Sequence, residues 1–510
     1  MLKTIVMKKN LSIIAYILIV FSAFSCTDLS EQVYSGIPLD EFFTTEKDVL
    51  MNAGRAYTKL QGMPEEFSLW TLTEMASDEM VAPGRDDGWV WDNGRWDQIH
   101  KHNLSSTNKI LTLAYGYVYE GISACNEVLY ETESSIIEFD GKDKIIAEIK
   151  ILRALFYYYA IDNWGNVPFS VDFTDKNLPV QKDRAFVLDF LIKEINDNVD
   201  ALQRVPDDSY YGRVTQSMAY TLLAKLYMNS EEWVGEARWE DAIEACDEVI
   251  NIGYYQIEDD YFTNFAVNNE VSKENIFVIP MHSIYTKDNF YWYTLTLNDA
   301  SRATFEFKGA MWDEFVLVPG FLDKYADNDI RKNSFLFGQQ KDKNGEDIVI
   351  DGEPFIYTPE IEDYMARKKW EGARGCKYEY QPDLEYYVND MENDYVIFRY
   401  ADVLYTKLEA LYRLGRREEE MLSDPDLMKI RTRAGLEPYS SGQLTDEEFL
   451  DELGREFAWE GHRRQDMIRF GVWADPWWNK PYSEDTDKLF PIPITVMNAN
   501  PNLEQNPGYY

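Results

Sequence analysis

The 510-residue chain has few of the side chains that enzymes use for covalent and metal chemistry. It contains 4 His and 4 Cys, and no two Cys have the C-x-x-C spacing of a zinc or redox site. It also lacks a G-x-S-x-G nucleophile elbow, an H-E-x-x-H helix, a Walker loop and a dinucleotide-binding glycine fingerprint. These absences disfavour the hydrolases, metalloenzymes and nucleotide-binding enzymes that depend on such motifs.

Basic residues are also scarce. The 50 Lys and Arg residues are outnumbered by 90 Asp and Glu, which gives a formal net charge of −40 and an isoelectric point near 4.4. The negative electrostatic field of such an acidic chain repels phosphate backbones and anionic lipid headgroups. We therefore expect no nucleic-acid partner and no polybasic docking on a membrane, whereas a neutral ligand is compatible with this charge.

The apolar run at residues 11–21 is too short to cross a membrane, which takes roughly 20 apolar residues. Lysines precede the run at positions 3, 8 and 9. A basic start followed by a short apolar stretch is typical of a secretory signal peptide, which we assign to residues 1–25. Met1 and Met7 both remain possible start residues.

Cys26 directly follows the predicted signal peptide. Small residues lead to it at Ala23 and Ser25, as in the cleavage site of a lipoprotein. Phe24 departs from that pattern, so an ordinary secretory signal is the alternative. We predict that Cys26 carries a lipid anchor and that residues 26–38 form a polar tether. Asp28 and Glu31 resemble the acidic signals of lipoproteins that are displayed on the cell exterior, so we expect the protein to face the exterior.

Helical periodicity dominates several separated blocks of the remaining chain. Apolar residues in 216–229 and in 239–250 recur at the spacing of one helix face, and a short polar stretch joins the two blocks. This pattern predicts an antiparallel helix pair, and its small and bulky residues alternate as in tetratricopeptide repeats. Two further pairs are predicted: 117–130 with 147–164, and 401–414 with 427–433.

Long aromatic stretches rich in Gly and Asp interrupt these pairs at about 80–105 and 255–395. They carry short strand-like runs at 276–280 and 348–350. Loops of this length inside a compact protein are usually functional. The sequence therefore predicts a mainly α fold, in which helix pairs form a scaffold and irregular insertions form the working surface.

The remaining cysteines form no disulfide framework. Cys125 and Cys246 lie on the apolar faces of predicted helices, so we expect buried, inert thiols. Cys376 lies in a glycine-flanked loop and is expected to be free.

Seven blocks, in order along the mature chain, resemble the SusD/RagB family of nutrient-binding lipoproteins of Bacteroidetes. They are 148–168 (EIKILRALFYYYAIDNWGNVP), 212–225 (GRVTQSMAYTLLAK), 399–410 (RYADVLYTKLEA), 430–435 (IRTRAG), 460–463 (EGHR), 490–493 (FPIP) and 500–509 (NPNLEQNPGY). The departures are small: Thr406 and Lys407 replace apolar or small residues, and Arg464 and Gln465 stand where an aromatic pair is common.

This resemblance implies a single SusD-like domain over residues 39–510, anchored at the outer membrane. It further implies a partner, a TonB-dependent SusC-like barrel over which such proteins close as a lid, and a role in nutrient uptake and polysaccharide utilisation. The ligands implied are mostly glycans and sometimes peptides. The family's glycan contacts lie in variable insertions, so it supplies no ligand-binding motif for this chain.

The stretch 85–96 is the first candidate for glycan contact. Sugar rings stack on aromatic faces, and sugar hydroxyls need planar polar partners. Gly88 and Gly94 indicate turns, so we expect a loop rather than a core helix. The candidate ligand-binding residues are Arg85, Trp89, Trp91, Asp92, Asn93 and Trp96.

The second candidate is an aromatic cluster that precedes Trp312: Tyr291, Trp292 and Tyr293. Contiguous aromatic residues cannot all point one way, so packing in the core is the alternative for some of them. The same alternative holds for the Trp residues of 85–96, which could fix that loop to the scaffold.

Catalytic and metal-binding roles have weaker support. Acidic residues are so frequent that their spacing does not exclude a glycosidase pair. His100 and His102 are two residues apart, but no third metal ligand accompanies them. The turn at 342–347 is similar to a calcium loop without its full ligand set. We expect a binding protein without catalytic residues and without a cofactor, with a structural calcium ion as the open alternative.

Overall fold

The computed structural model describes residues 43–88, 93–207, 209–286, 290–381 and 390–509. The predicted signal peptide, the tether and Cys26 lie outside the described residues. These predictions are therefore not tested by the fold.

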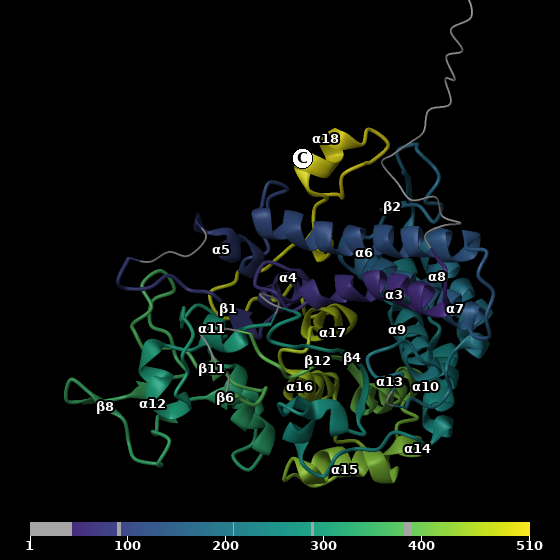
Figure 1. The fold of residues 1–510 in the computed structure, drawn as a ribbon. Coiled ribbons are helices and arrows are strands. Elements are labelled where there is room, and N and C mark those ends of the chain that lie inside the picture. Colours follow the sequence, from purple (N-terminus) through teal and green to yellow (C-terminus); the bar gives the residue numbers. More distant parts are fainter. Residues whose placement is uncertain (1–42, 89–92, 208, 287–289, 382–389, 510) are drawn as a thin grey trace, which may run out of the picture.

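The described residues fold mainly into α-helices (Figure 1). None of these helices is both long enough and apolar enough to cross a membrane. The helices are α3 (Glu46–Tyr57), α4 (Leu69–Met75), α5 (Arg95–His100), α6 (Lys109–Ser134), α7 (Lys142–Trp164), α8 (Arg184–Asn198), α9 (Gln216–Val234), α10 (Trp239–Ile252), α11 (Trp292–Thr296), α12 (Arg302–Phe305), α13 (Tyr400–Arg413), α14 (Glu419–Leu422), α15 (Pro425–Arg433), α16 (Asp446–Phe457), α17 (Arg463–Arg469) and α18 (Ile494–Ala499).

The strands of the described residues form two-stranded antiparallel pairs. These are β1 (Met80–Val81) with β5 (Val316–Leu317), β2 (Val167–Phe169) with β3 (Val180–Lys182), β4 (Asn275–Ile279) with β12 (Tyr395–Arg399), β6 (Phe335–Leu336) with β11 (Arg374–Gly375), β7 (Gly338–Gln339) with β10 (Ile356–Tyr357), and β8 (Val349–Ile350) with β9 (Glu353–Pro354). The strand-like runs predicted at 276–280 and 348–350 are confirmed as β4 and β8.

The predicted helix pairs are confirmed as α6 with α7, α9 with α10, and α13 with α15. The side chain of Thr215 accepts a hydrogen bond from the Met218 amide and so caps the start of α9. Both α9 and α10 end at a glycine with a left-handed backbone, Gly235 at φ 76° and Gly253 at φ 68°. In Figure 1, α7 to α10 lie on the right and α5, α11, α12 and β8 on the left, so the scaffold and the insertions occupy different halves of the view.

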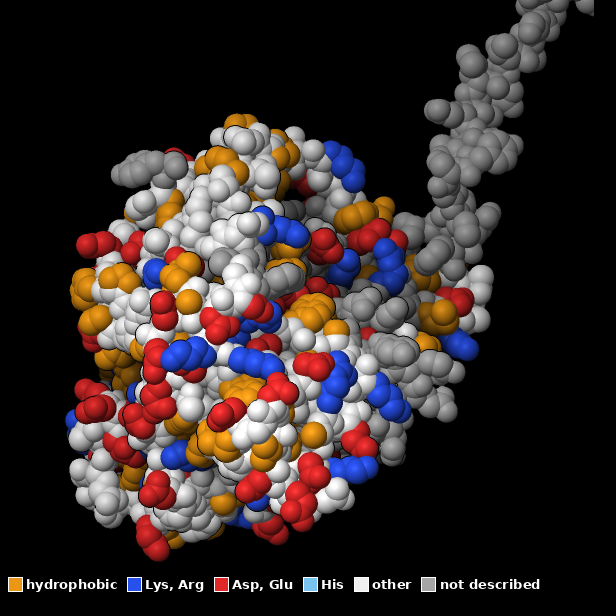
Figure 2. Space-filling view, turned by 90° about the vertical axis from the view of Figure 1, so that its left-hand side faces the viewer, with side chains coloured by type: hydrophobic (Ala, Val, Ile, Leu, Met, Phe, Trp, Pro, Cys, Tyr) orange, Lys and Arg blue, Asp and Glu red, His pale blue; other side chains and the backbone are white. Residues whose placement is uncertain are grey.

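The surface of the left half is mixed in character. Figure 2 shows this side as small groups of hydrophobic side chains between acidic and basic ones. No single sign of charge covers this face. A neutral ligand would therefore meet less electrostatic opposition here than a strongly charged one.

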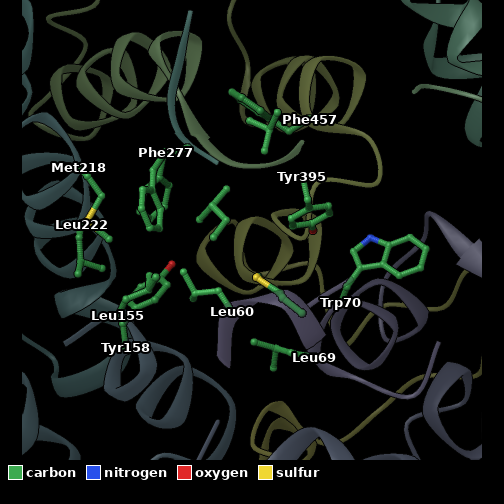
Figure 3. Close-up of a cluster of buried hydrophobic side chains, with 14 of the residues drawn as sticks. Leu60, Leu69, Trp70, Leu155, Tyr158, Met218, Leu222, Phe277, Tyr395 and Phe457 are labelled. Atoms are coloured by element: carbon green, nitrogen blue, oxygen red, sulfur yellow. The ribbon is translucent and has the colours of Figure 1, made fainter. Parts of the chain in front are cut away.

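The main hydrophobic core joins the scaffold to the insertions. Figure 3 shows Trp70, Phe277, Tyr395 and Phe457 in one buried cluster with Leu222 of α9. β4 and β12 are therefore part of the core, although they lie at the two ends of the long 255–395 insertion. Much of the aromatic surplus in this chain is used for packing.

The cysteine predictions can be compared directly with the structure. Cys125 and Cys246 are buried, and burial raises the pKa of both thiols. Cys376 is free and partly exposed, and burial raises its thiol pKa to about 12. The expectation that Cys125 and Cys246 are buried is confirmed, and a thiol with a raised pKa is a poor nucleophile.

A network of buried ion pairs connects several of the charged sequence blocks. Arg399 Nη1 lies 2.7 Å from Glu274 Oε1 and 2.6 Å from Glu456 Oε1, and its Nε lies 2.8 Å from Glu460 Oε2. Arg433 Nη2 contacts the same Glu456 oxygen at 2.7 Å. All five side chains are at most 3% exposed. The network ties β12, α15 and α16 to the residue before β4.

Glu74 and Glu79 form a second buried acidic feature, and they carry a pH prediction. Glu74 accepts a hydrogen bond from the amide of Gly461, and Glu79 accepts one of 2.8 Å from the amide of Trp459. Burial raises the pKa of Glu74 to about 7 and raises that of Glu79 well above its usual value. At these two carboxyl groups, the folded state therefore binds more protons than the unfolded state above pH 4.5.

The contribution of these two groups to stability should consequently fall as the pH rises from about 4.5 through 7 and beyond. We expect Glu79→Gln to raise the melting temperature at pH 8 and to change it little at pH 5, because the amide stays neutral at both values. Thermal unfolding from pH 5 to pH 9 measures this. The exposed Glu236→Gln is the control, and a melting temperature of Glu79→Gln that tracks the wild type at every pH would refute the prediction.

Candidate functional site

Three segments far apart in the sequence bring Arg85, Tyr291 and Trp312 together at the edge of the insertions. Arg85 follows β1, Tyr291 directly precedes α11, and Trp312 follows α12. Arg85 Nη1 donates a hydrogen bond of 3.1 Å to the carbonyl oxygen of Trp312. The rings of Tyr291 and Trp312 lie 5.9 Å apart at 72°, and both are partly buried against the core. We call this group the Trp312 cluster.

The backbone under the Trp312 cluster is held firmly. The Trp312 amide donates to the carbonyl of Thr294 at 2.7 Å. The guanidinium of Arg85 is also paired with Asp87, with 2.6 Å between Nη2 and Oδ2. These hydrogen bonds fix the backbone of Trp312 and the guanidinium of Arg85 relative to each other.

Asp313, the residue after Trp312, forms buried ion pairs next to the Trp312 cluster. Its carboxylate lies 2.7 Å from Arg374 Nη2 and 3.3 Å from Arg367 Nη1, and all three groups are buried. Burial alone would raise the pKa of Asp313, but the two guanidinium groups lower it below its usual value. The carbonyl of Arg367 in turn accepts a hydrogen bond of 3.0 Å from the amide of Asp86. These contacts fix the loop that carries Arg85 relative to Trp312.

Two of the predicted ligand residues, Arg85 and Tyr291, therefore lie in this cluster. Trp312 was not among the predicted ligand residues. Its local sequence gives only a single Trp before two acidic residues, and its partners Arg85 and Tyr291 are 227 and 21 residues away.

Trp96 corrects the prediction for the 85–96 stretch. Its side chain is 1% exposed, stacks on Phe67 at 5.7 Å between ring centroids and packs edge-on against Phe315 at 5.1 Å. Its indole N–H donates a hydrogen bond of 2.8 Å to Glu314. Trp96 fixes the chain to the core and cannot offer a ring face to a ligand. The predicted loop also ends two residues earlier, at Gly94, because α5 begins at Arg95.

Trp292 and Tyr293 are also core residues, each 4% exposed. Trp292 stacks on Trp70 with 4.1 Å between ring centroids. The hydroxyl of Tyr293 donates a hydrogen bond of 2.6 Å to the carbonyl of Tyr378. The prediction of ligand contact is wrong for these two residues, and the alternative of packing in the core is right.

The other predicted residues have different outcomes. Trp89, Trp91 and Asp92 lie outside the described residues, so their role stays a prediction. Asn93 is exposed, and its backbone is left-handed at φ 58°. Gly88 and Gly94 have φ values of 83° and 79°, so both predicted turns are confirmed.

His100 and His102 do not act as a pair. His100 Nε2 lies 3.1 Å from the carbonyl oxygen of Trp478, while His102 is hydrogen-bonded to the carbonyl of Ala76 and to the hydroxyl of Ser483. Burial lowers the pKa of His100 to about 4, so the ring is neutral at physiological pH. Both rings are used for internal hydrogen bonds.

The turn at 342–347 is also internally bonded. One carboxylate oxygen of Asp342 accepts hydrogen bonds from the amides of Asn344 and Glu346, at 2.8 and 2.9 Å. Across the described part of the chain, no group of three or more His, Cys, Asp or Glu side chains is arranged to hold a metal ion.

Comparison with family models matches most of the chain in two parts. Residues 273–509 match the SusD family, and residues 62–228 match a family described as starch-binding, associating with outer membrane. The chain is 24% identical to the starch-binding protein SusD of Bacteroides thetaiotaomicron over 86% of its own length and 85% of that protein. It is 23% identical to the SusD-like protein P25 of Formosa agariphila, covering 98% and 99% of the two chains.

Solved structures have the same fold. A laminarin-binding SusD-like protein superposes with a TM-score of 0.75 at 20% identity, over 92% of this chain and 100% of the other. Surface glycan-binding protein A from Bacteroides thetaiotaomicron, in complex with laminarihexaose, gives a TM-score of 0.70 at 21% identity, over 91% and 100% of the two chains. The matched segments contain the sequence blocks at 148–168, 212–225 and 399–509 and the buried network that several of them form. The chain therefore belongs to the SusD/RagB family.

Proposed function

We propose that this protein is a lipid-anchored, cell-surface glycan-binding protein of the outer membrane. It binds an oligosaccharide or polysaccharide without cleaving it and delivers it to a TonB-dependent SusC-like transporter. The Trp312 cluster, with the preceding 85–94 loop, is the proposed ligand site. The observation that supports the proposal is that aromatic and polar groups lie together in this cluster.

The chemistry of the Trp312 cluster suits a neutral sugar. A pyranose ring has a C–H face that packs on an aromatic ring, and its hydroxyls take hydrogen bonds from planar groups. The cluster combines a Trp ring, a Tyr ring and a guanidinium on a rigid base. The relatives support the same class of ligand, because their names specify binding of starch, laminarin or laminarihexaose.

Loss of the Trp312 ring should weaken binding by roughly thirtyfold. Burying about 100 Å² of ring against a sugar contributes on the order of 2 kcal/mol, and about 1.4 kcal/mol corresponds to a factor of ten. An array of plant, algal and host glycans would identify the ligand, and calorimetric titration would then compare wild type with Trp312→Ala. Trp239→Ala, at the start of α10, is the matched control and should bind like wild type.

The same samples test for catalysis. Prolonged incubation with the bound glycan should release no new reducing ends. Product formation by the purified protein would assign it to the glycoside hydrolases. If the protein bound only peptides, its ligand would be a peptide and not a glycan. An unchanged affinity of Trp312→Ala would place the glycan elsewhere on the molecule.

The proposed anchor gives a separate prediction. Cys26→Ala should move the protein from the membrane fraction to the soluble fraction, because the variant can no longer carry the thioether-linked lipid. Fractionation of cells that lack the transporter barrel, followed by immunoblotting, measures this. Retention of the variant in the membranes of such cells would contradict the lipid anchor at Cys26.

A further inference from the structure

A hollow of about 330 Å³ lies on the helical scaffold, away from the Trp312 cluster. Its walls come from residues 206, 207, 210–213 and 215, which precede α9, and from residues between 254 and 278, which follow α10 and include part of β4. In Figure 1, α9 and α10 lie to the right of β4 and β12, whereas β1 and α11 lie to their left. Its volume falls within the roughly 300–1,000 Å³ range of small-molecule sites.

Four tyrosines line this hollow, which we call the tyrosine pocket: Tyr210, Tyr211, Tyr254 and Tyr255. Two of the rings are held by cations. The guanidinium of Arg213 lies 4.3 Å from the centroid of the Tyr210 ring, and Lys273 Nζ lies 4.7 Å from that of Tyr254. Lys273 Nζ also donates a hydrogen bond of 2.9 Å to the hydroxyl of Tyr254, so these contacts fix the orientation of both rings.

Positive and negative side chains are equal in number among the residues that line the tyrosine pocket. Arg213 and Lys273 line it together with Asp207 and Glu270. Asn275 also lines the pocket, and its side-chain oxygen is buried without a hydrogen-bond partner among the described residues. An unpartnered buried acceptor is uncommon, and an ordered water or a ligand hydroxyl can satisfy it. Aromatic walls with balanced polar groups suit a neutral, hydroxyl-rich ligand.

The loop that closes the pocket has a fixed shape. Gly212 has a left-handed backbone at φ 69°, and a Cβ added there would lie 2.4 Å from the side chain of Pro280. Arg213 is held by Glu148 of α7 through hydrogen bonds of 2.7 and 3.0 Å. Gly212 and Arg213 also line a second hollow, of about 460 Å³, on the α3 side. The loop therefore separates two hollows and is held in place at both residues.

We propose that the tyrosine pocket is a second sugar-binding site that takes one or two pyranose units of a neutral glycan. This inference rests on the proposed function, since it assigns the same ligand class to a different part of the molecule. A second site would let one chain hold two oligosaccharides, or hold a polysaccharide at two points and so raise its effective affinity.

The test uses the full mature chain and the shortest oligosaccharide that the glycan array selects. Calorimetric titration of wild type should show two sites per chain, and Trp312→Ala should leave one of them at its original affinity. Adding Tyr254→Ala to that variant should weaken the residual binding by about tenfold, the loss expected when about 60 Å² of ring contact is removed. Tyr254→Phe, which keeps the ring, should retain most of it. Tyr210→Ala provides a second, independent variant of the same wall.

The outcomes separate the two proposals. If wild type binds no glycan on the array, the proposed function and this inference both fail. If wild type binds a glycan but Trp312→Ala shows no residual site, only the second site is overturned. The second site is likewise overturned if residual binding is unchanged in Tyr254→Ala and Tyr210→Ala variants whose circular dichroism shows that they are folded.

Discussion

Glu456→Gln should reduce the free energy of unfolding by about 3–5 kcal/mol, the usual result of removing one partner from a buried ion pair. The Glu456 carboxylate accepts hydrogen bonds from Arg399 at 2.6 Å, from Arg433 at 2.7 Å and from Arg331 at 2.9 Å. All four side chains are at most 1% exposed. A neutral amide would leave three buried guanidinium groups with less compensating charge.

Denaturant unfolding at pH 7 measures this loss. The matched control is Glu447→Gln in the first turn of the same helix, where the side chain is exposed and the expected change is within about 0.5 kcal/mol. Equal unfolding free energies for Glu456→Gln and Glu447→Gln would show that the network contributes no net stability.

The effect should also depend on pH. Burial raises the pKa of Glu456, but the guanidinium groups of Arg433, Arg399 and Arg331 outweigh burial and lower it to about 2. A carboxylate with a lowered pKa stabilises the fold above its unfolded pKa of about 4.5 and loses that contribution as the pH falls toward 2. The difference in the free energy of unfolding between wild type and Glu456→Gln should therefore shrink below pH 4.5. Glu79 has the opposite sign, because its carboxyl destabilises the fold as the pH rises.

This network explains why the sequence blocks identify the family more easily than the ligand. Arg399, Arg433, Glu456 and Glu460 bind one another inside the core, and Gly212 fits beneath Pro280. These positions are constrained by the fold, whatever the ligand is. The Trp312 cluster, in contrast, lies in the insertions outside these blocks, so the resemblance gives no information about its residues.

The helix pairs could be predicted because their signals are local. The periodic apolar face of 216–229 and the glycines that end α9 and α10 all lie within one stretch of about 40 residues. Apart from β4 and β8, the short strands of the insertions have no such signal. Met80 pairs with Leu317 in a two-residue ladder, and the partners are more than 200 residues apart. Only the folded chain brings such segments together.

The candidate site was partly predictable for the same reason. The glycines at 88 and 94 correctly indicated turns, and Arg85 and Tyr291 lie where ligand contact is proposed. The polar neighbours of Trp96 indicated an exposed ring, but its burial depends on Phe315 and Glu314, about 220 residues away. Trp292 is likewise buried by Trp70. Local polarity cannot report the distant surfaces that cover a large aromatic ring.

Trp292→Ala should therefore be a stability variant, with a loss of about 3–5 kcal/mol in the free energy of unfolding, as is typical for a buried Trp. The ring stacks on Trp70 at 4.1 Å and contacts Phe290 and Tyr378 edge-on at 5.3 and 5.2 Å. Removing it leaves a cavity lined by aromatic residues that cannot all move inward. Denaturant unfolding measures the loss.

Trp292→Phe is the informative control. The indole N–H of Trp292 is buried without a hydrogen-bond partner among the described residues, so replacing the indole by a phenyl ring removes an unsatisfied donor. The variant should recover more than half of the stability lost in Trp292→Ala. Trp312→Ala should show the opposite balance, with a large loss of glycan affinity and a smaller loss of stability, because its ring is only partly buried. If Trp292→Ala unfolds like wild type but loses glycan affinity, its assignment to the core is wrong, and the ligand site extends to residues that this structure places inside the fold.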